Sequence, residues 1–142
     1  MNYKKIFLKK GKESSLERFH PWVFSGAVAY ADKNIAEGEI VEVYTANKEF
    51  IAVGHFQIGS IAVRVLSFNQ QEINHDFWVK RLAAAYQMRK DLGLDYTPEH
   101  SSFRLVHGEG DFLPGLIVDF YGSTAVMQAH SVGMHMHREE IA

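Results

Sequence analysis

Hydrophobic and polar residues alternate along most of the first 68 residues, which is the pattern of β-strands that bury one face. Branched and aromatic residues dominate the apolar positions. Tight turns are predicted at Asn47-Lys48 and at residues 58–60, between neighbouring strands. Several short strands with tight turns in about 70 residues fit a small β-barrel. The predicted strands span residues 3–9, 22–24, 40–44, 50–56 and 61–66.

A short helix interrupts this pattern between the first two strands. Residues 10–12 form a turn, and Ser14 or Ser15 can cap a helix that directs Leu16 and Phe19 inward. Pro21 excludes helix from the residue before it and starts an extended segment. Because apolar neighbours surround Trp22, we expect its indole to pack in the core.

The polar segment 68–76, FNQQEINHD, marks a boundary, and a second kind of pattern follows it. Asn74 or Asp76 can cap a helix, which Gly93 ends after a basic last turn. Residues 94–102 are a connector. The residues that recur at helical spacing, and so define the buried face of this helix, are Phe77, Trp78, Leu82, Ala85, Tyr86, Arg89 and Leu92.

Glycine and proline concentrate in residues 104–122, RLVHGEGDFLPGLIVDFYG, between two short apolar runs. Such a pattern predicts a strand, a tightly specified loop and a second strand. A partner strand is predicted at 124–129 and a helix at 134–142, with no capping residue at its end. An antiparallel sheet with helices is therefore expected after residue 70.

Composition and charge narrow the classes of protein. The apolar fraction of 46% is enough for a core, and charges or glycines interrupt every apolar run before it reaches membrane-spanning length. The basic N-terminus lacks the apolar segment of a signal peptide, and cysteine is absent, so we expect a cytoplasmic protein without disulfides. The net charge is -2, yet the first 20 residues hold six basic and two acidic residues. This asymmetry indicates that the N-terminal part faces a polyanion.

Three groups of residues have side chains that could serve catalysis or bind a metal. Glu109, Asp111 and Asp119 lie in or beside the glycine-rich loop, where acids serve catalysis or cap backbone amides in turns. His107 with the two aspartates lacks an activated serine nearby, which argues against hydrolysis. His130, His135 and His137 cluster in sequence, but on a helix the last two point to opposite faces. We therefore predict no catalytic residue and no metal site.

Two segments resemble one known family. The loop segment 104–122 resembles the middle of the bacterial 23S ribosomal RNA cytosine-C5 methyltransferases, and HPWVFSGAV at 20–28 is similar to the PUA segment of the same family. The two matches occur in the family's order and at plausible spacing. The family's chains run from a PUA RNA-binding domain through a small linking domain to a methyltransferase domain that uses S-adenosyl-L-methionine (SAM).

The resemblance implies an α+β fold, with a PUA-like barrel at 1–70 and a helix plus partial linking domain at 71–142. No strand, glycine-rich turn and helix of a SAM-binding domain is recognisable, and the family's cysteines are missing. We expect the RNA-recognition portion of such an enzyme, with SAM serving the whole protein and not bound by this chain. The alternative is a stand-alone PUA-type RNA-binding module without enzymatic activity.

The resemblance also suggests which residues bind RNA. Basic residues at one end of the barrel would contact phosphates, and an aromatic ring such as Phe19 or Trp22 could stack on an unpaired base. Lys4 and Lys5 are assigned to solubility. A sheet cut before its neighbours also favours a homodimer or swapped assembly. The predicted RNA-binding residues are Lys9, Lys10, Lys12, Arg18, His20 and Arg64.

Overall fold

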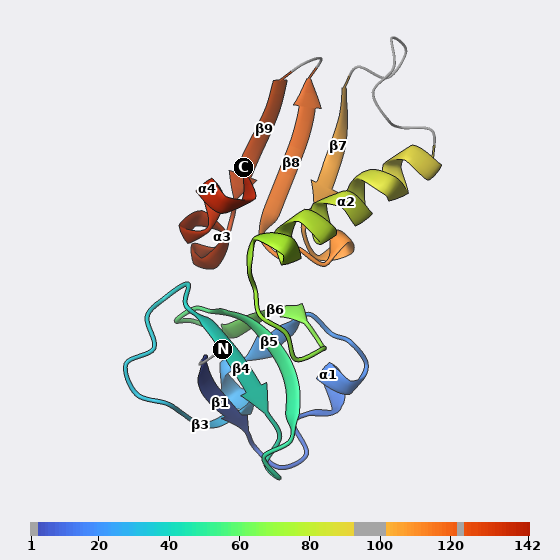
Figure 1. Cartoon of the computed structure of the whole chain (residues 1–142). Coiled ribbons are helices and arrows are strands. Elements are labelled where there is room, and N and C mark those ends of the chain that lie inside the picture. The colour runs from blue at the N-terminus through green and yellow to red at the C-terminus, as the bar shows by residue number, and fades with distance from the viewer. Residues whose placement is uncertain (1–2, 93–101, 122–123) are drawn as a thin grey trace. The chain divides into compact units, whose positions relative to one another are not determined.

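The computed structural model describes residues 3–92, 102–121 and 124–142 of the 142-residue chain. It divides into two compact units, Met1–Glu72 and Ile73–Ala142. The first unit contains a six-stranded sheet, and the second contains a three-stranded sheet and the longest helix (Figure 1). Each unit is described by itself.

The first unit is built from short strands, as the alternating pattern predicts. The strand order is β2-β6-β5-β4-β1-β3, in which β1 and β4 are parallel and the other pairs are antiparallel. Five of the six strands are confirmed to within about one residue. The strand β3 was not predicted. Three of its four residues are exposed, so buried and exposed positions do not alternate along it. The elements are β1 (Lys4–Leu8), α1 (Ser14–Glu17), β2 (Trp22–Phe24), η1 (Ser25–Ala27), β3 (Val28–Ala31), β4 (Ile40–Tyr44), β5 (Phe50–Phe56) and β6 (Ile61–Ser67).

The connection from β2 to β3 forces this sheet to curl. These two strands lie at opposite ends of the sheet, yet only the three residues of η1 separate them. Six flat strands would place their end strands about 24 Å apart. The four Cα steps from Phe24 to Val28 reach at most about 15 Å. The sheet therefore wraps around its core, which confirms the expected small barrel-type fold. The end strands β2 and β3 are connected by η1 and do not pair with each other.

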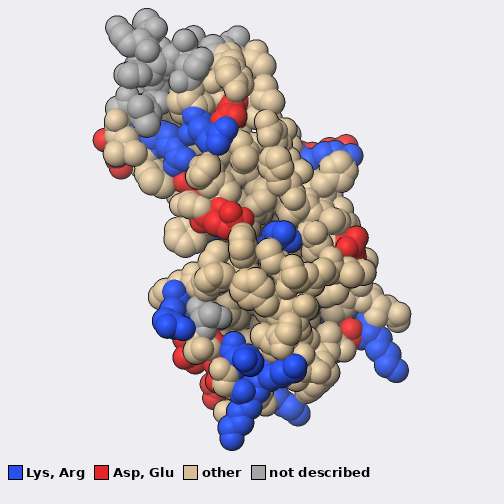
Figure 2. Space-filling model, turned by 180° about the vertical axis from the view of Figure 1, so that it is seen from behind, with Lys and Arg blue, Asp and Glu red and all other residues tan. Residues whose placement is uncertain are grey.

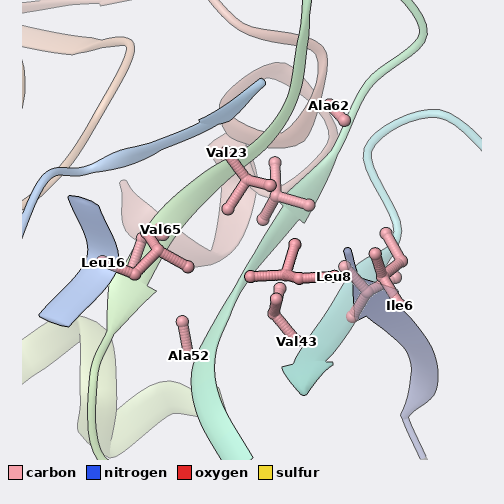
Figure 3. Close-up of a cluster of buried hydrophobic side chains, with 10 residues drawn as sticks. Ile6, Leu8, Leu16, Val23, Val43, Ala52, Ala62 and Val65 are labelled. Atoms are coloured by element: carbon pink, nitrogen blue, oxygen red, sulfur yellow. The ribbon is translucent and has the colours of Figure 1, made fainter. Parts of the chain in front are cut away.

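Alternating side chains from these strands fill the inside of the curled sheet. Figure 3 shows Ile6 and Leu8 from β1 converging with Val43 of β4 and Val65 of β6. Leu16, only 2% exposed, anchors α1 to this core. On β5, Gly54 allows the backbone carbonyl of Arg64 to approach so closely that any Cβ would overlap it. Close packing, rather than polar contacts, thus holds the barrel together.

Two aromatic residues predicted inside this core are not there. Phe19 is 68% exposed because α1 ends at Glu17 and Phe19 adopts a left-handed φ of 62°, which turns its ring away from the core. Trp22 is only half-buried and does not belong to the core cluster. On the three-residue strand β2, Val23 faces inward, so its two neighbours must face outward.

The second unit places a long helix beside an antiparallel sheet of order β7-β8-β9. Asn74 caps α2 by accepting the Phe77 N–H at 3.0 Å, as predicted. The expected stop at Gly93 and most of the connector at 94–102 lie outside the described residues. Tyr86 and Leu92, predicted on the buried face, are 41% and 66% exposed. The elements are α2 (His75–Asp91), β7 (Ser102–His107), η2 (Gly108–Asp111), β8 (Leu116–Tyr121), β9 (Thr124–Ala129), α3 (Val132–Met136) and α4 (Arg138–Ile141).

The predicted C-terminal helix is two short helices instead of one. Ser131 caps α3 by accepting the Met134 N–H at 3.2 Å. His137 separates α3 from α4. The buried residues Met134 and Ile141 each fall on one of them. The single apolar pattern from 134 to 142 therefore spans a break that its periodicity did not reveal.

Candidate nucleic-acid interface

The turn that follows β1 presents a group of lysines at one end of the first unit. Lys9, Lys10 and Lys12 are all exposed. The Lys12 N–H donates to the Lys9 carbonyl at 3.0 Å, and Gly11 adopts a φ of 83° that closes the turn. The Lys9 N–H donates to the Ala27 carbonyl at 2.8 Å, which docks the turn against η1. Figure 2 shows basic side chains gathered on the first unit, in the lower part of that view.

A hollow of about 440 Å³ opens between this basic turn and η1. One wall holds Gly11, Lys12 and Ser14, and the other holds Phe24, Gly26 and Ala27. Nothing lies within 4 Å of a Cβ built at Gly26, so this wall is open where a side chain would project. The volume falls in the range of small-ligand sites, and the walls combine an ammonium group with an aromatic ring.

Three aromatic rings lie next to the hollow. His20 lies 6.0 Å from both Trp22 and Phe24, measured between ring centroids, and Trp22 lies 6.3 Å from Phe24. The Trp22 N–H donates to Nδ1 of His20 at 3.2 Å, which fixes the loop before β2. Phe24 is 48% exposed and belongs to both the aromatic cluster and the hollow. It therefore joins the two features into one surface.

The structure places five of the six predicted RNA-binding residues in two groups and leaves Arg18 apart from both. Lys9, Lys10 and Lys12 share the basic turn. His20 lies in the aromatic cluster, and Arg64 is the cross-strand partner of Trp22 on β6. Arg64 is half-buried, and its guanidinium donates to Oε1 of Gln57 at 2.8 Å, so that nitrogen is already engaged. Arg18 is exposed just after α1.

Phe24 and Gly26 were missed as candidate site residues. The apolar run around Trp22 predicted burial of that ring, and no role was predicted for Phe24. Applying the two-residue period of a strand to Val23 alone would have placed Trp22 and Phe24 outside. Nothing in the sequence marked Gly26 as a site residue. Its φ is not positive, and the open space beside it can be seen only in the structure.

Two of the three acidic residues at 104–122, Asp111 and Asp119, are engaged in ion pairs. Asp111 accepts from Arg89 Nη1 at 2.6 Å and from Nη2 at 2.8 Å, and also from the His107 N–H at 2.6 Å. Asp119 accepts from Arg104 Nε at 2.7 Å, and this hydrogen bond is the main reason why the pKa of Arg104 is raised. The amide-capping interpretation is confirmed for Asp111. Both aspartates are thus committed to structure rather than presented for catalysis.

The described residues hold no cluster of three or more metal-ligating side chains. Among the described residues, the connections from a strand to the following helix are not the glycine-rich turns that SAM sites use. The connections from β6 to α2 and from β9 to α3 contain no glycine, the connection from β1 to α1 contains Gly11 alone, and η2 follows β7 before another strand. No described helix is long and apolar enough to cross a membrane.

The first unit is of the PUA-like class. Residues 6–68 match the family model described as a PUA-like domain. The fold of the chain is similar to that of a Streptococcus mutans protein described as a SAM-dependent methyltransferase, with a TM-score of 0.79, 18% identity, and coverage of 96% of this chain and 35% of that one. The basic turn, the hollow and the aromatic cluster all lie within the matched residues.

The most informative sequence relatives are proteins named ribosomal RNA large subunit methyltransferase I. The protein of Erwinia tasmaniensis is 41% identical over 136 residues, covering 94% of this chain and 34% of its own length. The protein of Vibrio campbellii is 35% identical over 141 residues, covering 96% of this chain and 34% of its own length. The chain therefore spans about a third of the length of the curated relatives that it matches.

Proposed function

We propose that this chain is the RNA-recognition portion of a SAM-dependent methyltransferase that modifies C5 of cytosine in ribosomal RNA. The observation that carries the proposal is the open hollow flanked by the basic turn and by the exposed ring of Phe24. Ammonium groups bind RNA phosphates without reading sequence, and an exposed ring stacks on an unpaired base. The names of the relatives support the class of RNA and the class of reaction.

The roles within the whole protein follow from this proposal. The predicted domains at 1–70 and 71–142 act as separate parts of the protein, of which the first binds folded RNA. Lys9, Lys10, Lys12 and Arg18 contact phosphates, while His20 and Arg64 border the aromatic cluster. SAM, the transferred methyl group and the choice of cytosine belong to the remainder of the protein. Locating the methyl group on ribosomal RNA modified by the whole protein tests the choice of base.

RNA binding is tested by fluorescence anisotropy with the 142-residue chain. Fragments of large-subunit ribosomal RNA are expected to bind, and duplex DNA of equal length to bind more weakly. Gly26→Phe fills the hollow and is expected to weaken RNA binding about tenfold, because a Cβ at Gly26 has open space before it and no strained φ. Gly26→Ala is the matched control and is expected to bind like the original chain. Equal binding of RNA and duplex DNA, insensitive to Gly26→Phe, contradicts the proposal.

We also propose that the second unit associates as a homodimer or swapped assembly through β9. In the described part of the sheet, β9 is an edge strand that pairs only with β8, and Thr124, Ala125 and Val126 on it are exposed. An unpaired edge offers N–H and C=O groups to a second copy. Light scattering is expected to give twice the monomer mass, and Val126→Lys, which places a charge on the exposed edge strand, is expected to shift it toward monomer. A monomer at high concentration contradicts this.

A further inference from the structure

Four aromatic side chains form a row across four neighbouring strands of the first unit, apart from the hollow. In register, Tyr30 of β3 faces Phe7 of β1, Phe7 faces Tyr44 of β4, and Tyr44 faces Phe50 of β5. The Phe7 ring stacks on Tyr30 at 4.6 Å with 18° between planes, and on Tyr44 at 5.6 Å with 29°. Phe50 meets Tyr44 edge-on at 5.9 Å. We call these four residues the aromatic row.

The aromatic row lies on the outer face of the curled sheet. Its neighbours along the strands, Ile6 and Leu8 on β1 and Val43 on β4, point into the core, and side chains alternate between faces. Tyr30 is 55% exposed, and the other three rings are half-buried. The core therefore does not account for the row, because no ring of it reaches the inside.

Polar contacts hold the middle of the row in place. The Tyr44 hydroxyl donates to Oε1 of Glu42 at 3.2 Å, and Gln70 donates to the other oxygen of Glu42 at 3.1 Å. Burial, and then the charge of Glu42, raise the pKa of Tyr44, so its hydroxyl stays protonated. The Lys5 ammonium lies 5.2 Å from the centre of the Tyr44 ring. A fixed ring with a cation beside it suits both a flat base and a phosphate.

The row also borders the basic turn. β1 and β4 are parallel, and Phe7 and Tyr44 are register partners near the ends of these strands. The residues that follow β1 and the residues that follow β4 therefore leave the sheet at the same ends of the strands. The basic turn follows β1, and the turn that holds the exposed Lys48 follows β4. An RNA strand whose phosphates contact these lysines would have its bases next to the aromatic row.

We propose that the aromatic row binds unpaired nucleotides of single-stranded RNA by base stacking, as a second contact beyond the hollow; this rests on the proposed RNA-binding function. Successive bases stack on exposed aromatic side chains of a sheet while the backbone follows basic residues. The spacing and near-parallel planes of Phe7 with its two neighbours place the rings as a continuing stack, which a base on the exposed side of Tyr30 would extend.

The test removes a ring without removing charge. Tyr30→Leu, alone and combined with Phe7→Leu, is titrated against a single-stranded RNA and against the blunt RNA duplex of the same sequence. Tyr30→Leu is expected to weaken single-strand binding about tenfold, leave duplex binding unchanged and leave the salt dependence unchanged. Tyr30→Phe keeps the ring and is expected to bind like the original chain. Tyr86→Leu, at an exposed tyrosine of the second unit, controls for loss of a surface ring.

The outcomes separate the two proposals. If the original chain binds neither RNA, the proposed function fails. If it binds RNA but Tyr30→Leu and the double variant keep their single-strand affinity, the row does not stack bases, while the proposed function stands. Equal weakening toward single strand and duplex also overturns the stacking role. Circular dichroism of the Tyr30→Leu chain, an exposed position, checks that a loss of affinity is not a loss of fold.

Discussion

Replacing Lys10, Lys12 and Arg18 together by glutamate is expected to weaken RNA binding by about 100-fold at about 50 mM salt. Each cation that neutralises a phosphate releases counterions from RNA, so losing three such contacts lowers affinity and its dependence on salt together. The slope of log affinity against log salt is expected to fall by about two. The loss should be similar for RNAs of different sequence, because phosphate contacts carry no sequence information.

A matched control separates local contact from net charge. Replacing Lys80, Lys90 and Arg138 of the second unit by glutamate changes the net charge by the same amount at exposed positions. These variants are expected to change RNA affinity only a few-fold. If both triple variants lose affinity equally, long-range charge accounts for the effect and the basic turn is not the contact surface.

Asp111→Ala is expected to destabilise the second unit by about 3–5 kcal/mol. The Asp111 and Arg89 side chains are only 2% and 12% exposed, and both guanidinium Nη atoms donate to the carboxylate. The alanine variant leaves a nearly buried guanidinium without its counter-charge and the His107 N–H without its acceptor. Because a domain is stable by only about 5–15 kcal/mol, such a loss is close to unfolding this unit.

The measurement uses the two tryptophans, of which one lies in each unit. In a Trp22→Phe background, fluorescence of Trp78 during urea unfolding reports on the second unit. Arg104→Ala is the control, since its ion pair with Asp119 is also bidentate but the Arg104 side chain is 46% exposed. That variant is expected to destabilise the unit far less, because solvent screens an exposed ion pair. Equal destabilisation by the two variants would show that burial of the Arg89 pair contributes nothing.

Five of the six strands of the first unit could be predicted because strand patterning is a local property, and on β1 and β4 alternate residues enter the core cluster. What the sequence could not show is how far a pattern extends once the backbone changes direction. Phe19 follows the last residue of a four-residue helix in a left-handed conformation, so the helical period no longer applies to it. Trp22 lies on a strand so short that its apolar neighbours concealed the alternation.

The RNA-binding site stays a prediction, and the residues predicted for it are only part of the surface that the structure describes. Charge asymmetry located the lysines of the basic turn, which are adjacent in sequence. The hollow depends on Phe24 and Gly26, which meet the turn only because η1 carries the chain from one end of the sheet to the other. The pairing of Arg89 with Asp111 joins a helix to a loop 22 residues away. Contacts of that range depend on tertiary packing, which a single sequence does not display.

The pairing of β2 has a consequence for how the molecule is made. β2 finds its ladder only with β6, whose residues follow it by about forty positions. During synthesis, Trp22 and Phe24 therefore emerge from the ribosome well before their partner strand does. Loop closure over such a separation is slow compared with forming the hairpin between β5 and β6. The wall that holds Phe24 is thus among the last parts to assemble, so the hollow forms in a nascent chain only when the first unit is complete.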